Sequence, residues 1–178
     1  IFQERTCGIG VIPREMAIAW GVTGPALRAS GVDFDLRRDA PYGIYDRFSF
    51  EVPVAPSGIN GVVGDCFHRH WVRVKEIEQA TRIARAALDA LPEGEIQGKV
   101  PKGLKPPKGE VYVRVENPRG ELAFYMISDG ADKAYRARCR GPSFSNISVI
   151  TEVAPGTLIA DLVALMGSLD IVLGEVDR

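Results

Sequence analysis

Two histidines and a cysteine stand close together in the segment Cys66-Phe67-His68-Arg69-His70, and these residue types suggest metal chemistry. On a helix, Cys66 and His70 would lie one turn apart on the same face, as zinc ligands often do. A closed zinc site needs four ligands, whereas the chain has 2 histidines and 3 cysteines in all, without a second close pair. We therefore favour a structural role and expect no metal in this chain. A non-catalytic scaffold or metal-binding module is the alternative.

Arg119 and Asp170 are the charged residues whose settings suggest proton or oxyanion chemistry. The residue types of Asn117-Pro118-Arg119-Gly120 fit a type I turn, which would place Arg119 at a hairpin tip between Glu116 and Glu121. A guanidinium there could orient a carboxylate or polarise a carbonyl oxygen. Asp170 lies among apolar residues, where burial makes proton transfer feasible. Their ordinary interpretations are an exposed turn residue and a helix cap.

The composition is typical of one globular domain rather than of a disordered, fibrous or membrane-spanning chain. The chain has 178 residues, of which 46% are hydrophobic and 25% charged, and its net charge of -1 gives no drive toward nucleic acid. No apolar run is long enough to span a bilayer. Three widely spaced cysteines suit a reducing, cytoplasmic compartment. The start at Ile1 suggests part of a longer protein.

Helical periodicity is strongest over residues 65–90, with Asp65 as the expected N-cap. We expect this helix to pack through an apolar stripe and to leave its charged residues, among them Arg69, Arg73 and Glu76, in solvent. The stripe consists of Phe67, Trp71, Val74, Ile77, Thr81, Ala84 and Leu88. A short helix is predicted over 14–20, and residues 22–64 read as irregular segments with a strand-like piece at 48–54.

Beyond a basic, Pro- and Gly-rich connector at 97–109, the hydrophobic period changes to two. Residues 110–116 and 121–127 alternate as strands do, and a third strand is predicted over 135–140. The chain then returns to an apolar helix at 157–167, which we expect to be buried. These elements predict a single α+β domain over 1–178, mainly helical with a small antiparallel sheet.

Several strings, taken in this order, resemble one known family over nearly the whole chain. They are GVTGPALRASG (21–31), DLRR (35–38), PY (41–42), PPKGEVY (106–112), PRGEL (118–122), SDG (128–130), PSF (142–144) and GSLDIVLGEVDR (167–178). The chain resembles the carboxy-terminal half of the hydrogenase-like, quinone-site subunit of proton-pumping NADH:quinone oxidoreductase, respiratory complex I. The terminal string is highly specific, and the short ones are individually weak.

The resemblance implies a peripheral-arm protein on the cytoplasmic side of the membrane, held there by partner subunits. Quinone, the substrate, would enter between this subunit and a partner that carries the terminal iron–sulfur cluster. A membrane-arm subunit would lie near the quinone entrance, and NADH would react at a distant subunit. The family's main quinone ligands, a His and a Tyr, belong to the amino-terminal half, so this chain alone should not reduce quinone.

The same resemblance makes the carboxy-terminal tail interpretable as an emptied metal site. Nickel–iron hydrogenases, whose large subunit the fold would resemble, end with Asp-Pro-Cys-x-x-Cys-x-x-His. Asp170 keeps the acid of that pattern, Val172 and Glu175 replace the cysteines, and Arg178 replaces the histidine. Without thiolates a nickel–iron centre cannot be built. The resemblance thus implies that Asp170, Val172, Arg119, Glu175 and Arg178 line or support a quinone cavity.

The segment between Leu91 and Gly109 is shorter than is usual in the family, where it often contains a further helix. A short connector is compatible with relatives that use a deazaflavin or ferredoxin donor in place of NADH. A membrane-bound hydrogenase-type subunit is a further alternative. It would require pairs of cysteines at both ends of the full protein.

Overall fold

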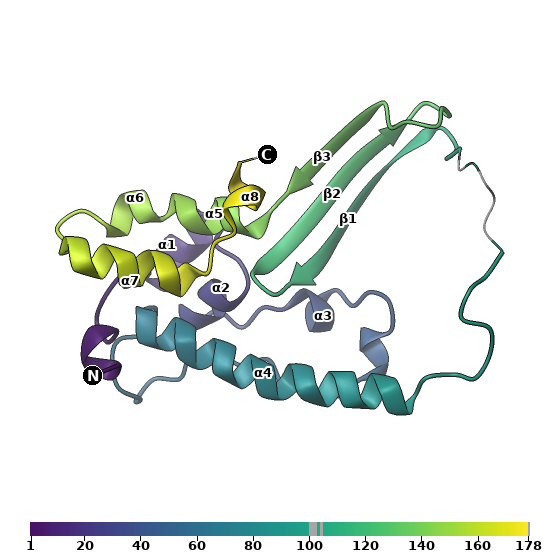
Figure 1. The fold of residues 1–178 in the computed structure, drawn as a ribbon. Coiled ribbons are helices and arrows are strands. Elements are labelled where there is room, and N and C mark those ends of the chain that lie inside the picture. The colour runs from purple at the N-terminus through teal and green to yellow at the C-terminus, as the bar shows by residue number, and fades with distance from the viewer. Residues whose placement is uncertain (100–102, 104, 178) are drawn as a thin grey trace.

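A three-stranded antiparallel sheet projects from a body of helices in the computed structural model, which describes residues 1–99, 103 and 105–177 (Figure 1). In chain order the elements are η1 (Gln3–Arg5), α1 (Arg14–Ala19), α2 (Pro25–Ala29), α3 (Leu36–Asp39), η2 (Tyr45–Arg47), α4 (Cys66–Asp89), β1 (Gly109–Asn117), β2 (Gly120–Ser128), β3 (Arg136–Arg140), α5 (Pro142–Ser148), α6 (Ile150–Val153), α7 (Ile159–Leu169) and α8 (Leu173–Val176). The predicted α+β class, mainly helical with a small antiparallel sheet, is confirmed.

The helical body has α4 along one side, α5 to α8 along the other, and α1 and α2 between them (Figure 1). Its main core lies between α1, α2 and the carboxy-terminal helices. Ile12, Ala17, Leu27, Val149 and Leu169 are buried there in one cluster. The core is therefore formed by residues that are distant in sequence, and their packing fixes the carboxy-terminal helices against the amino-terminal ones.

The long helix α4 begins as predicted, because the Asp65 carboxylate accepts a hydrogen bond of 2.8 Å from the His68 amide. The predicted apolar stripe, however, is wrong as the packing face. Val74, Ile77 and Leu88 are 43%, 65% and 72% exposed. The buried residues of α4 are Cys66, His68, Arg69, Val72 and Gln79. The burial of Arg69 contradicts its predicted place in solvent.

Three strands in the order β1-β2-β3 form the sheet, with antiparallel pairing throughout. Asn117 pairs with Gly120 across the predicted turn, so Arg119 does lie at the hairpin tip. Valines of β1 and Phe124 and Met126 of β2 share one face by register, and both faces are largely exposed. The tip of the hairpin meets the helical body, and the other end of the sheet extends away from it (Figure 1).

Several segments differ from the sequence-based expectation. Residues 48–54 form no strand, and the supposedly irregular stretch 22–64 contains α2, α3 and η2. The predicted burial of the helix at 157–167 is wrong for most of its surface: α7 buries Leu165 and Leu169, but Ile159 is 87% and Val163 71% exposed. The described residues thus leave much of the apolar surface of α7 uncovered.

The predicted connector lies between the end of α4 at Asp89 and the start of β1 at Gly109, and residues 100–102 and 104 are outside the described part of the chain. None of the helices in the described ranges combines the length and apolarity needed to cross a bilayer.

Candidate functional site

Arg119 at the hairpin tip contacts Asp170 at the end of α7, although the two residues are 51 positions apart. The Nε of Arg119 donates to the main-chain oxygen of Asp170 at 2.8 Å, and an Nη2 lies 3.4 Å from the Asp170 carboxylate. Glu116 and Glu121, which flank Arg119 in sequence, pair with Arg28 and Arg140 instead. The candidate site is therefore where the hairpin meets the tail.

Asp170 adopts an uncommon backbone conformation that helps to present this contact. It terminates α7 with φ at 54°, and among the described non-glycine residues it is the one with a positive φ. An aspartate tolerates the left-handed region better than most residues. The turn redirects the chain at the end of α7, so that the main-chain oxygen of Asp170 accepts the bond from Arg119. The predicted capping role of Asp170 holds at the helix's carboxyl end.

Two arginines of α4 support the end of α7 next to Asp170. Arg73 donates to the main-chain oxygen of Ser168, and Arg69 donates through Nε to the Ser168 hydroxyl at 2.8 Å. Arg69 also donates to the main-chain oxygens of Gly10, at 2.9 Å, and Gly64. Burial lowers the pKa of both guanidinium groups. These contacts tie α4, the amino-terminal loop and the end of α7 together.

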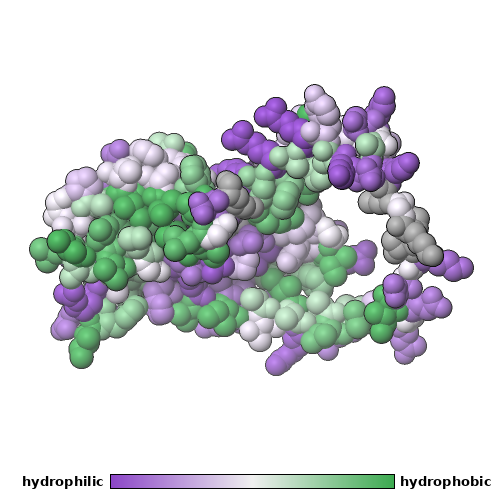
Figure 2. All heavy atoms as spheres, turned by 45° about the horizontal axis from the view of Figure 1, so that its top comes forward, coloured by the Kyte–Doolittle hydropathy of each residue, from purple (hydrophilic) through white to green (hydrophobic). Residues whose placement is uncertain are grey.

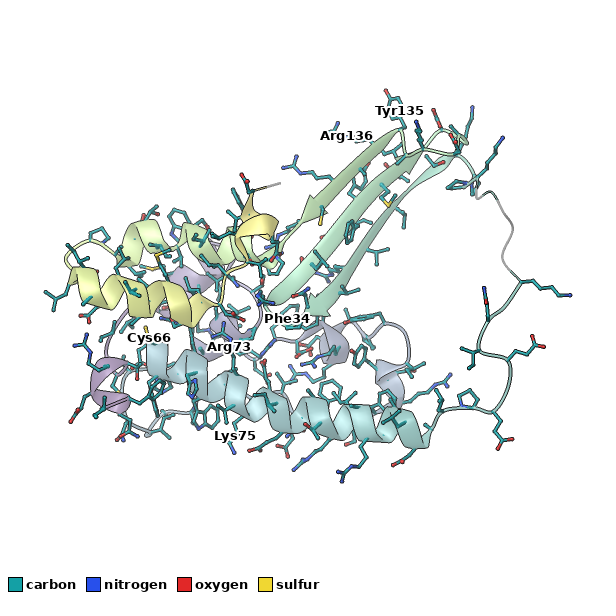
Figure 3. All side chains as sticks on the ribbon, in the orientation of Figure 1. Phe34, Cys66, Arg73, Lys75, Tyr135 and Arg136 are labelled. Atoms are coloured by element: carbon teal, nitrogen blue, oxygen red, sulfur yellow. The ribbon has the colours of Figure 1, made fainter. Side chains whose placement is uncertain are left out.

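Two hollows flank Asp170 and share the Arg73 side chain as a wall. One, of about 400 Å³, lies toward η2 and the hairpin tip. The other, of about 580 Å³, lies between the amino-terminal turn and α7, where Phe2, Ala164 and Gly167 are part of its lining. Arg73 points from α4 into the space between the two helical layers (Figure 3). Its Nε is buried and has no acceptor among the described residues.

Of the other predicted site residues, Val172 lies next to the contact between Arg119 and Asp170, and Glu175 lies further away. Val172 is 38% exposed, and its amide donates to the Ser143 hydroxyl at 3.2 Å. Glu175 accepts a hydrogen bond from the same hydroxyl and lines a different hollow, beside β3. Arg119 and Asp170 are thus brought together, Val172 lies two residues further, and Glu175 faces α5. Arg178 is outside the described residues.

A buried ionic cluster anchors the hairpin beside its tip, near the site. Arg28 bonds to Glu76 at 2.7 Å and Glu116 at 2.9 Å, and lies 3.5 Å from Asp35. Burial alone would lower the pKa of Arg28, but the three carboxylates together raise it. Burial raises the pKa of Glu116, because one guanidinium shared among three carboxylates offsets only part of its desolvation. Arg28 therefore remains charged and holds α2, α4 and β1 in one arrangement.

The Cys66, His68 and His70 cluster is engaged in structural contacts. His68 Nδ1 lies 2.8 Å from the Asp65 carboxylate, and the ring of His70 contacts that of Phe2, with the centroids 4.7 Å apart and the planes tilted by 60°. Cys66 Sγ accepts from Arg69 at 3.2 Å. No group of three or more His, Cys, Asp or Glu side chains is placed to hold a metal ion within the described ranges.

Arg69, Arg73, Arg28 and Glu76 are the residues of the site that the sequence analysis missed. On α4, Arg69, Arg73 and Glu76 recur at spacings of four and three, so that they occupy one face. Such a charged row between apolar positions is typical of a solvated surface. The spacing of these residues on one helical face was a sign in the sequence that they act together. The oxygen atoms to which the arginines donate, however, lie in segments distant in sequence.

Comparison with known proteins accounts for the whole chain. The family model described as "Respiratory-chain NADH dehydrogenase, 49 Kd subunit" matches residues 1–102 and 98–178. The D subunit of NADH-quinone oxidoreductase from Dehalococcoides mccartyi is 54% identical over 98% of this chain and 46% of its own length. The protein of the same name from Clostridium beijerinckii is 52% identical over 100% of this chain and 46% of its length.

A third relative, one of the D subunits of NADH-quinone oxidoreductase in Anaeromyxobacter dehalogenans, is 52% identical over 100% of this chain and 47% of its own length. The chain thus spans about half the length of the curated relatives it matches. Because the family model covers it from end to end, the resemblance seen in the sequence is confirmed. The chain belongs to the family of the 49 kDa subunit of respiratory-chain NADH dehydrogenase.

Proposed function

We propose that this chain is part of the quinone-binding subunit of a proton-translocating NADH:quinone oxidoreductase and forms one wall of its quinone cavity. The observation that carries the proposal is the contact between Arg119 and Asp170, with a hollow on either side. A partner subunit with the terminal iron–sulfur cluster completes the cavity. The chain lies on the cytoplasmic side of the membrane, where its partners hold it.

The chemistry of this place suits the ring of a quinone, which carries two carbonyl oxygens and gains two electrons and two protons. Apolar atoms of Phe2, Ala164 and Gly167 offer contact to a ring. The buried Nε of Arg73 can donate a hydrogen bond but has no acceptor among the described residues. Arg119 lies beside the Asp170 carboxylate nearby. This chain supplies a wall and secondary polar groups, while electrons arrive by tunnelling from the partner's cluster.

Substitution at the site tests the proposal in the assembled complex. Asp170→Ala removes a carboxylate, and Val172→Met adds volume two residues on. Each should lower quinone reductase activity or raise the KM for quinone, while the donor still reduces the iron–sulfur cluster as followed by electron paramagnetic resonance. Asp89→Ala at the far end of α4 is the matched control and should leave quinone kinetics unchanged. Unaltered kinetics in both site variants would remove these residues from the cavity.

The relatives are D subunits of NADH-quinone oxidoreductases, which favours the NADH:quinone reaction over the deazaflavin-, ferredoxin- or hydrogenase-type alternatives. Assays of the purified assembly with NADH, a reduced deazaflavin and reduced ferredoxin as donors distinguish the donor-dependent alternatives. Stoichiometric nickel would instead support a hydrogenase-type subunit.

A further inference from the structure

The outer edge of β3 (Arg136–Arg140) is open along residues 136–138. Among the described residues these three pair with β2 alone, so one row of their N–H and C=O groups faces away from the sheet. Residues 136–138 are exposed along this edge. Figure 3 shows Tyr135 and Arg136 at the end of the sheet that lies away from the helical body. An unpaired edge of this kind is a template for another strand.

Positive charge is concentrated on one face of this edge. Arg136, Arg138 and Arg140 alternate along β3, so their side chains share a face. Arg140 is paired with Glu121 at 3.2 Å, whereas Arg136 and Arg138 form no ion pair with any described residue. Hydrophilic side chains gather over the distal end of the sheet (Figure 2). The edge therefore presents two cations, two residues apart, that are available to a partner.

The opposite face of the same edge is apolar. Ala137 and Cys139 pair by register with Met126 and Phe124 of β2, which are 41% and 44% exposed. A strand added here would meet arginines on one face and an apolar surface on the other. Two surface hollows, of about 420 and 490 Å³, lie along β3 and leave room beside it.

We propose that the free edge of β3 at residues 136–138 is a docking site for an extended, acidic segment of a partner subunit, which pairs with it as a fourth strand. Main-chain hydrogen bonds supply the pairing, and alternate side chains supply its specificity. Carboxylates at every second position of the partner, about 7 Å apart, match the spacing of Arg136 and Arg138. The intervening residue of the segment is apolar and covers Ala137.

A second copy of this chain does not fit the edge. Pairing of β3 with β3 would place arginines beside arginines, and like charges opposite one another destabilise a sheet. The other free edge, on β1, carries alternating Glu110, Tyr112 and Arg114, so it has no excess of one sign. Charge complementarity therefore favours an acidic partner over a second copy of the chain, and it favours the β3 edge over the β1 edge as the docking site.

Zero-length carbodiimide coupling in the purified complex that contains this chain tests the proposal directly. The Arg138→Lys substitution keeps the charge and introduces an amine that couples to carboxylates in contact with it. Mass spectrometry should find the amine introduced at position 138 joined to one partner segment with acidic residues at alternate positions. Ala137→Lys, on the apolar face of the same edge, is the matched control and should couple several-fold less. Equal coupling in the two variants, or coupling of the Arg138→Lys amine to Glu175 alone, would overturn the proposal.

Hydrogen exchange of the intact complex gives an independent readout. The β3 amides should exchange slowly, and Arg136→Glu combined with Arg138→Glu should speed their exchange several-fold. The same double reversal at Arg82 and Arg85, on α4, should leave β3 unchanged. Fast exchange in the wild-type complex would overturn the proposal, because it would show that the edge stays unpaired and that the arginines only prevent its association with other strands. Because neither readout involves quinone, this proposal and the proposed function can fail separately.

Discussion

Asp65 is a fully buried carboxylate whose two oxygens accept hydrogen bonds from three main-chain amides and a histidine ring. One oxygen serves the amide and ring of His68, and the other accepts from the amides of Gly8 and Val62. Burial by itself would raise the pKa of the Asp65 carboxyl, but these donors together lower it. The ionised side chain thus joins the amino-terminal loop to the start of α4.

Replacing Asp65 by Asn should destabilise the fold, because an amide nitrogen cannot accept from Gly8 and Val62. Each buried donor left unsatisfied costs about 1–3 kcal/mol. The pKa of Asp65 is lower in the folded than in the unfolded state. Its contribution to the free energy of unfolding is therefore fully present at pH values above the unfolded-state pKa. That contribution is lost as the pH falls through the folded-state pKa. Unfolding of the monomeric chain, followed by circular dichroism at pH 7 and at about pH 4, measures both effects. An Asp65→Asn variant as stable as wild type at pH 7 would contradict this account.

Arg28 gives a second prediction at the level of the residue. Arg28→Met should lower the free energy of unfolding by about 3–5 kcal/mol, because it leaves Glu116, Glu76 and Asp35 without their shared cation. Arg38→Met is the control, since Arg38 pairs with Asp33 and Asp39 near the surface and should cost about 0–1 kcal/mol. Denaturant titrations compare the two, and equal losses would refute the special role of the buried cluster.

The hairpin and α2 approach each other so closely that only glycine fits on both sides. Gly24 precedes α2 and Gly120 begins β2, both with positive φ, and a Cβ on either would overlap the main chain of the other segment. Asn146 of α5 bonds to both segments, through the Thr23 amide at 2.9 Å and the Arg119 carbonyl at 3.0 Å. This junction positions the hairpin tip on the helical body.

Gly120→Ala should therefore destabilise the chain by roughly 3 kcal/mol through overlap and backbone strain. Gly43 also has a positive φ, at 61°, but a Cβ there meets open space. Gly43→Ala isolates the cost of backbone strain, about 1–2 kcal/mol. Free energies of unfolding for the two variants separate the contributions. Equal values would mean that the close approach at Gly120 does not matter.

How far the sequence predicted these elements depended on whether the signal was local. The period of α4, its Asp65 cap, the alternation of β1 and β2, and the turn at 117–120 are local patterns, and each was found within about one residue. Burial was not predictable in this way. Arg69 is buried because its partners Gly10, Gly64 and Ser168 come from other segments. The contact of Arg119 with Asp170 was likewise invisible, although the family resemblance named both residues.

At the scale of the whole molecule, much apolar surface is uncovered by the described residues. Leu158, Ile159 and Val163 at the start of α7 are 68%, 87% and 71% exposed, and one face of the sheet adds valines and Phe124. Hydrophobic residues gather over this part of the helical body (Figure 2). Exposed apolar surfaces of this kind are typical of protein–protein interfaces. It is consistent with a chain that works within an assembly.

The isolated chain should accordingly self-associate as its concentration rises. Ile159→Lys combined with Val163→Lys should shift sedimentation toward the monomer, because each adds a charge to the apolar surface of α7. Thr151→Lys on the neighbouring helix α6 adds a charge outside that surface and is the control. A wild-type chain that remains monomeric at every concentration would contradict the expectation.

The bond between Arg119 and the main-chain oxygen of Asp170 has a consequence for how the tail can vary. The shorter of the two contacts ends on a carbonyl group that every amino acid possesses. The acid at position 170 can therefore be exchanged without releasing the guanidinium, provided that the replacement tolerates a φ of 54°. Orientation of the cation and acidity of the tail are thus separable properties, and selection can change one of them while the other persists.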